Sequence, residues 1–223
     1  MEIKDLKPEL VWKFFSELSE IPRGSGDEKA VSDYLVNFAK ERNLEVRQDE
    51  ALNVIFKKDA SAGYEDKPTI ALQGHMDMVC VKEDSSDHDF SKDPIKLIVD
   101  GDWVRADGTT LGADDGMGVA FILAIFDDKD IAHGPLEAII TTGEETSMVG
   151  ANALDASDIK AQYLINIDTE EDGILTIGCA GGCDLEISFK KEKEAAKGDF
   201  LKLDLRGFEG GHSGMEIDRA RLN

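Results

Sequence analysis

Acidic side chains and one histidine recur in this sequence at points where an apolar run ends. His75 and Asp77 are two residues apart, so in an extended segment they face the same side. A carboxylate placed there can hydrogen-bond the imidazole and fix the tautomer that binds a metal ion. Taken alone, the pair is weak evidence, because a histidine that caps a strand end beside an incidental acid explains it better. The pair therefore needs support from the rest of the chain.

Two adjacent aspartates, Asp114 and Asp115, precede an apolar run. Either carboxylate would serve as a helix cap and interact favourably with the helix dipole. The flanking glycines, Gly112 and Gly116, favour a second interpretation, because they let the backbone turn tightly and bring one carboxylate into a crowded site. A carboxylate that bridges two cations needs such a turn.

Glu144 and Glu145 are adjacent acids that follow a strand of the buried type. Two unpaired carboxylates there would be costly unless cations neutralise them, although acids in a solvated loop are the simpler alternative. The functional interpretation divides the labour between the two side chains. One glutamate binds a metal ion, and its neighbour takes a proton from the water that the metal activates.

The elements expected to position these residues follow an α/β pattern. Apolar spacing predicts helices over residues 8–18, 27–42 and 119–126. Strands are predicted over residues 44–48, 53–56, 69–73, 95–98, 102–105, 136–142 and 163–167. Four strand ends then carry acids or histidine toward one rim, which is where ligands bind in open α/β sheets. We therefore expect a central mixed sheet flanked by helices.

The sequence pattern changes from about residue 181. Residues 184–189 and 200–206 alternate like half-exposed strands, which predicts a catalytic domain over residues 1–180 and the start of a smaller α+β lid domain over residues 181–223. A domain of about 40 residues is too small to bury its own core. The chain also ends in a helix start without a C-cap. We therefore expect a fragment, or a partner chain that completes the lid.

Composition excludes some classes of partner. The 223 residues include 47 Asp and Glu against 25 Lys and Arg, for a net charge of -22, which repels nucleic acid phosphates and anionic lipid surfaces. The N-terminal segment lacks a long apolar region, and no window is long enough to span a bilayer. The three cysteines are odd in number and form no disulfide-like framework. We expect a cytoplasmic protein that binds neither nucleic acid nor membrane.

Five motifs occur in order along the chain. They read GHMDMV, TTLGADDGMG, TTGEETSMVGA, LINIDTEE and GGHSG. Together they make the sequence resemble the M20 metallopeptidases, most closely the aminoacyl-histidine dipeptidases, over essentially all of its length. The resemblance implies a zinc-peptidase-like fold and hydrolysis of the peptide bond of dipeptides, with Xaa-His as the leading substrate type. It also implies two divalent cations, with zinc as the leading candidate and manganese or cobalt as alternatives.

The resemblance implies a set of metal ligands. His75 and Asp168 would bind the first cation. Asp114 would bridge the two cations, and Glu145 would bind the second. Members of the family supply a further histidine to the second cation from near their C-terminus, and nothing in these 223 residues matches it. We therefore expect this chain to bind the first cation better than the second.

The resemblance also implies catalytic roles. Asp77 would orient the metal-binding histidine. Glu144 would be the general base that activates water and later protonates the leaving amine. His212 resembles a lid-domain histidine that, in dimeric relatives, reaches the neighbouring subunit's site and stabilises the oxyanion. That role would require a homodimer through the lid domain.

Other functions stay open at this point. A tripeptidase or an N-acyl amino acid deacylase of the same family would share these motifs, because substrate choice depends on other residues. A non-catalytic metal-binding or scaffolding protein, such as an inactive fragment that lacks the C-terminal histidine ligand, is an alternative of another class. Such a protein would need neither a general base nor an oxyanion donor, which argues against it. A nucleotide-binding protein is disfavoured, because residues 112–118 lack the Gly-Lys-Ser/Thr ending of a phosphate-binding loop.

Overall fold

The computed structural model describes residues 2–169, 173–178, 187–190, 198, 201–204 and 206–207. The chain divides into two compact units, residues 1–174 and 175–223. Among the described residues, every helix and strand lies in the first unit.

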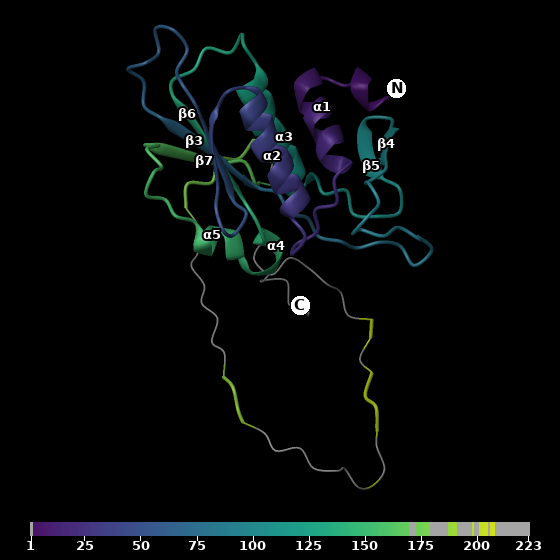
Figure 1. The fold of residues 1–223 in the computed structure, drawn as a ribbon. Helices are drawn as coiled ribbons and strands as arrows, with labels where there is room; N and C mark the ends of the chain where they lie inside the picture. Colours follow the sequence, from purple (N-terminus) through teal and green to yellow (C-terminus); the bar gives the residue numbers. More distant parts are fainter. Residues whose placement is uncertain are drawn as a thin grey trace. The chain divides into compact units, whose positions relative to one another are not determined.

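A mixed sheet of five strands forms the centre of the first unit, in the order β1-β2-β6-β3-β7 (Figure 1). Its strands are β1 (Glu45–Gln48), β2 (Val54–Lys58), β3 (Ile70–His75), β6 (Leu136–Thr141) and β7 (Tyr163–Asn166). The pairs β1–β2 and β2–β6 are antiparallel, whereas β3 runs parallel to both β6 and β7. The register pairs His75 with Thr141 and Gln73 with Asn166, so the carboxyl ends of these three strands meet at one edge.

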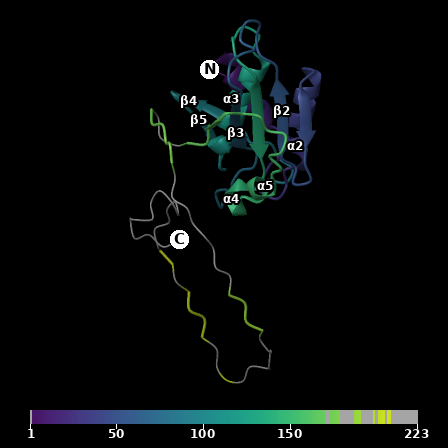
Figure 2. The same ribbon diagram turned by 90° about the vertical axis from the view of Figure 1, so that its left-hand side faces the viewer.

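Three long helices cover one face of this sheet (Figures 1 and 2). They are α1 (Glu9–Ser19), α2 (Lys29–Glu41) and α3 (Ala113–Asp127). Helix α2 lies against β1 and β2, α3 lies against β3, and α1 packs on α3. Because α3 lies between α1 and the sheet, it is apolar around most of its circumference, whereas α1 buries a single stripe. The predicted α/β class, with a mixed sheet flanked by helices, is confirmed.

Aromatic rings join the helices to the sheet. Phe56 of β2 is fully buried, and its ring centroid lies 5.8 Å from that of Phe38 in α2 and 4.8 Å from that of Phe126 in α3. Phe38 also meets Phe14 of α1 edge to face, at 5.3 Å. Such contacts add to the free energy gained by burying the rings. One continuous core therefore fixes the helices on the sheet.

The opposite face of the sheet carries a smaller cluster. Ile55, Ala71 and Ile139 are buried there, and they pack against Leu154, Ile159 and Ala161. The carboxylate of Glu137 on β6 is also buried, and it accepts hydrogen bonds from the backbone N–H groups of Lys160 and Ala161 at 2.9 to 3.0 Å. This carboxylate ties the segment that precedes β7 to the centre of the sheet.

One expectation about strands is wrong, and one predicted strand is more exposed than its sequence indicates. Strands β4 (Leu97–Asp100) and β5 (Trp103–Ala106) form a separate two-stranded sheet, so the turn before Asp114 does not follow a strand of the central sheet. Strand β7 has the apolar sequence of a buried strand, yet all four of its residues are exposed. It is an edge strand of the described sheet, and its apolar composition alone did not reveal this.

Some helices were not predicted. The short helices α4 (Glu144–Ser147) and α5 (Val149–Ala153) follow β6, and a single 3-10 turn, η1 (Ile3–Asp5), precedes α1. None of them is long enough to show an apolar period. Helix α3 also extends back to Ala113, earlier than the expected residue 119, and it is kinked at Asp114 and Asp115, whose backbone angles are not helical.

The described residues of the second unit carry no regular structure. Strands were expected over residues 184–189 and 200–206, but the described residues of those ranges are not in strands. The other residues of these ranges, together with His212, lie outside the described part of the chain. In the part that the structure describes, no helix is long and apolar enough to cross a membrane.

The aromatic core makes a prediction about stability. Phe56→Ala should lower the free energy of unfolding by about 3–5 kcal/mol, because it removes the ring between α2 and α3 and leaves a cavity. Urea titration followed by circular dichroism measures this loss. Phe189→Ala removes a ring that is 76% exposed and should change the stability by less than about 0.5 kcal/mol. Equal losses in the two variants would contradict the packing described.

Candidate metal centre

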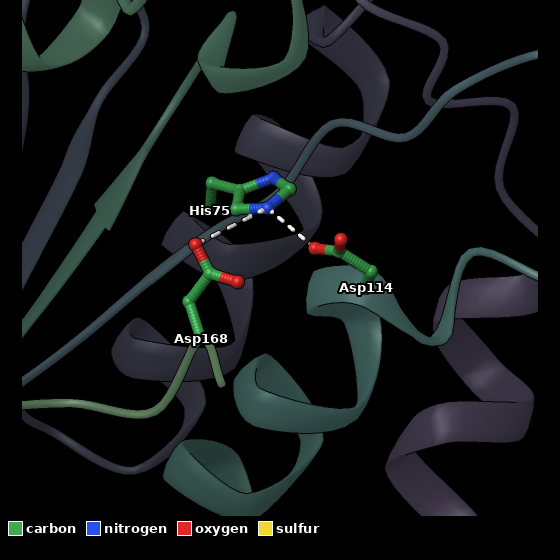
Figure 3. A group of neighbouring side chains, drawn as sticks. All are labelled: His75, Asp114 and Asp168. Carbon is green, nitrogen blue, oxygen red and sulfur yellow. Dashed lines mark hydrogen bonds and ion pairs between the residues drawn. The ribbon is translucent and has the colours of Figure 1, made fainter. Parts of the chain in front are cut away.

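The parallel register brings three strand ends to one place. His75 is the last residue of β3, Asp168 lies two residues beyond the end of β7, and Glu144 begins the helix that follows β6. The fourth contributor, Asp114, comes from the first turn of α3. Figure 3 shows Asp114 and Asp168 approaching the same ring nitrogen of His75 from different elements.

The Nε2 atom of His75 is the centre of the group. It lies 2.9 Å from Asp114 Oδ1, 3.9 Å from Asp168 Oδ2 and 3.9 Å from Glu144 Oε2. The ring is 1% exposed, whereas the carboxylates around it are partly open to solvent. Two sets of side chains each offer donor atoms that lie within 4.8 Å of one another. The first set is His75, Asp114 and Asp168, and the second is His75, Glu144 and Glu145. The predicted ligands therefore gather at one site.

Asp77 lies on the other side of the imidazole and is fully buried. Its Oδ1 atom is 3.3 Å from His75 Nδ1, and its carboxylate accepts hydrogen bonds from Ser25 Oγ at 2.7 Å. It also accepts bonds from the backbone N–H groups of Glu144 at 3.1 Å and Glu145 at 3.3 Å. One carboxylate thus holds both the histidine ring and the first turn of α4.

The electrostatics reflect this crowding of negative charge. Burial lowers the pKa of His75, but the neighbouring Asp114 and Asp77 carboxylates outweigh it and raise the pKa to about 11. Burial raises the pKa of Asp77, but its contact with the imidazole of His75 and its hydrogen bonds from Ser25 and the Glu144 N–H lower it to about 2. The imidazole therefore lies in a strongly negative potential, which favours any cation.

Three other carboxylates, those of Glu144, Glu145 and Asp115, have raised pKa values, in contrast to Asp77. Burial raises the pKa of Glu144 and of Glu145, and the negative charge of Asp114 adds to both shifts. Burial likewise raises the pKa of Asp115 to about 7. These groups would ionise more readily beside a bound cation than they do beside one another.

Asp115 is a site residue that sequence analysis did not assign. It is 3% exposed, and its Oδ2 atom accepts the backbone N–H of His75 at 3.1 Å. The peptide bond between Asp114 and Asp115 is cis. A methyl carbon at Gly74 or Gly118 would overlap the Asp115 carboxylate, so both glycines leave room for it. Glycines at these two positions were the available signal for an inward-facing acid.

The donor set fits a divalent cation. One imidazole nitrogen and several carboxylate oxygens are the ligands that zinc, manganese and cobalt share. The ring is oriented by a carboxylate on its far nitrogen, as is usual for a metal-binding histidine. A mixed α/β sheet whose strand ends gather such donors has the architecture expected of a metallopeptidase.

The comparisons with known proteins identify the family. The chain belongs to peptidase family M20/M25/M40, which it matches over residues 71–213. It is 43% identical over 218 residues to the cytosol non-specific dipeptidase of Escherichia coli (strain K12). The matched region covers 97% of this chain and 45% of that protein.

Solved structures agree with this assignment. The aminoacylhistidine dipeptidase of Vibrio alginolyticus matches with a TM-score of 0.76 and 45% identity, over 78% of this chain and 35% of that one. A tripeptidase of Staphylococcus aureus matches with a TM-score of 0.62 and 27% identity, over 74% of this chain and 44% of that one. The chain thus spans less than half the length of these relatives.

The contacts of Asp77 make a second prediction. Asp77→Asn should lower the free energy of unfolding by roughly 1–3 kcal/mol, because an amide accepts fewer hydrogen bonds and turns donor atoms toward backbone N–H groups. Chemical denaturation of the metal-free protein measures the loss. The matched Asp66→Asn change, at a side chain that is 79% exposed, should have an effect below about 0.5 kcal/mol. An undiminished stability in Asp77→Asn would show that this carboxylate does not hold the site.

Proposed function

We propose that this chain supplies the metal-binding site and the general base of a peptidase that hydrolyses small peptides, with Xaa-His dipeptides as the leading substrate. The observation that carries the proposal is the buried imidazole of His75, whose Nε2 atom faces Asp114, Asp168 and Glu144 in a member of the M20 family. The dipeptidase names of the relatives from Escherichia coli and Vibrio alginolyticus support it.

The family resemblance supplies an assignment of the cation ligands, and the distances support its first set. His75 and Asp168 would bind the first cation, and Asp114 would bridge it to a second one bound by Glu145. The donor atoms of His75, Asp114 and Asp168 already form one compact set. When bound, such cations act as Lewis acids that polarise a carbonyl group and make water a stronger acid. Zinc is the leading candidate, with manganese or cobalt as alternatives.

Glu144 is the proposed general base. Its side chain is partly exposed and lies next to the cation donors, while its backbone N–H is held by Asp77. Burial raises the pKa of Glu144, which makes the carboxylate a better proton acceptor. It would take a proton from the attacking water and later pass it to the leaving amine.

The two cations would not be bound equally. A neutral imidazole offers one lone pair, and the Nδ1 atom of His75 faces Asp77, so Nε2 can serve only one of the two donor sets. If His75 serves the first cation, the donors left for the second among the described residues are carboxylates. The first cation should therefore bind more tightly.

The wider setting of the site is also a proposal. We infer a catalytic domain over residues 1–180 and a lid domain that begins at residue 181, with His212 as an oxyanion donor in a homodimer. The cytosolic location named for the Escherichia coli relative supports a cytoplasmic protein. A tripeptidase is the closest alternative, since the Staphylococcus aureus structure bears that name.

Metal titration tests the ligand assignment. Calorimetry with zinc should show one tight site and a weaker second one. Asp168→Asn should weaken the tight site, because it removes one of its carboxylate charges, whereas Asp66→Asn should leave both sites unchanged. Two equally tight sites in this chain would rule out the unequal donor sets described.

Peptide turnover tests the reaction. Hydrolysis of β-alanyl-histidine is measured with the zinc- or manganese-loaded chain, alone and mixed with a C-terminal fragment. Where turnover is found, Glu144→Ala should lower its rate by about 100-fold or more without loss of bound metal. Elemental analysis measures the metal, and a tripeptide and an N-acetyl amino acid serve as competing substrates. Metal binding without turnover in the wild-type chain would favour a metal-binding fragment over an active peptidase.

A further inference from the structure

Arg23 is the largest fully buried side chain whose function the proposed reaction leaves unexplained. It lies in the loop between α1 and α2, is 2% exposed, and precedes the part of the chain that matches the family. A buried guanidinium is costly unless its N–H groups are paired. The contacts of Arg23 therefore indicate its role in the structure.

The guanidinium donates hydrogen bonds to the backbones of two separate turns. Nη1 donates to the carbonyl oxygens of Met76 at 3.1 Å and Asp77 at 3.3 Å, in the turn that follows β3. Nη2 donates to the carbonyl oxygen of Gly112 at 2.6 Å, in the turn that begins α3. The first turn directly follows His75, and the second leads to Asp114. Arg23 thus links the two segments whose side chains meet at 2.9 Å.

Two glycines make room for this link. A methyl carbon built on Gly112 or on Gly116 would lie 2.5 Å from Nη2 of Arg23, so a side chain at either position would displace the guanidinium. The backbone of Arg23 joins the same structure, because its carbonyl oxygen accepts the N–H of Met78 at 3.1 Å. The arginine is therefore enclosed by the turns that it connects.

The guanidinium also supplies a fixed positive charge behind the carboxylates. Burial lowers the pKa of Arg23 to about 10, against the opposing effect of Asp77 and Asp115. The group stays protonated at neutral pH. The guanidinium is buried behind the site. The proposed metal ions would instead be bound on its solvent side, at the partly exposed carboxylates.

Other side chains of the same loop hold neighbouring parts of the site. Ser25 Oγ donates to Asp77 Oδ2 at 2.7 Å. The buried Glu28 accepts the N–H of Gly143, just before α4, at 3.2 Å. Residues 23–28 therefore contact the turn after β3, the turn before α3 and the turn before α4. Among these residues, Arg23 is the one whose side chain bridges two of the turns.

We propose that Arg23 is a positioning residue, whose guanidinium sets the separation between the turn after β3 and the turn before α3, and through them the geometry of His75 and Asp114. The expected consequence of this link is tight binding of a cation in the correct coordination geometry, and that consequence rests on the proposed function. The link itself exists in the metal-free protein and can be tested there.

The first test measures cation binding and its geometry. Arg23→Lys keeps the charge but cannot reach three carbonyl oxygens in the same fork, so zinc affinity should fall by about 10- to 100-fold. The visible absorption of bound cobalt should change in shape, which a loss of overall stability would not cause. The control is Arg42→Lys, at an arginine that bonds to Asp127 and to the Phe38 carbonyl oxygen at the end of α2. Unchanged zinc affinity and cobalt absorption in Arg23→Lys would overturn the proposal.

A second variant covers the case in which Arg23→Lys does not fold. Gly116→Ala retains the arginine but displaces its guanidinium, and it should weaken zinc binding in the same way. Gly178→Ala is the matched control, because a methyl group there meets nothing within 4 Å. Equal zinc affinity in the two glycine variants would contradict the proposed role.

The third measurement needs no metal. Hydrogen exchange of the metal-free protein should accelerate at the amides of Met78 and Gly116 in Arg23→Lys, while the core amides of β6 keep their protection. If the wild-type chain binds no cation, the proposed function is wrong. The exchange measurement does not depend on that result, because it tests the link between the turns in the metal-free protein. Uniform or unchanged exchange would overturn the link.

Discussion

Negative charge gathered around one buried imidazole is the constraint on which the rest of the site depends. Asp77, Asp114, Asp168 and Glu144 all approach the ring of His75, and Asp115 accepts its backbone N–H. Carboxylates this close raise one another's pKa unless cations or hydrogen bonds compensate. The fold must hold them together against this repulsion. The parallel register of β3, β6 and β7 does so first, because it brings three of the chain segments to one edge.

Hydrogen bonds to the backbone then fix the details. Asp77 accepts the N–H groups that begin α4, and Arg23 donates to the turns on either side of the imidazole. Each contact joins elements that are far apart in the sequence. They therefore act as a framework behind the ring, while Asp114 and the glutamates remain open to solvent, where a substrate could approach. Rigid support behind an open set of ligands is what a preorganised metal site requires.

Sequence reasoning located most of this site because the relevant signals are local. His75 and Asp168 follow apolar strands, and residues at strand ends in a parallel sheet must meet. It could not show that Asp115 turns inward or that Arg23 is buried, since both depend on contacts between distant segments. It misplaced the Asp114 turn, because nothing local distinguishes a strand of the central sheet from one of the separate hairpin. The exposure of β7 likewise depends on its neighbours and not on its own sequence.

The most direct test of this account is a crystal structure of the chain with zinc, examined for anomalous scattering. We predict a zinc ion at about 2.0–2.1 Å from Nε2 of His75, with carboxylate oxygens of Asp114 and Asp168 completing its contacts. A zinc ion bound elsewhere, with the imidazole of His75 still held only by its carboxylate neighbours, would contradict the account.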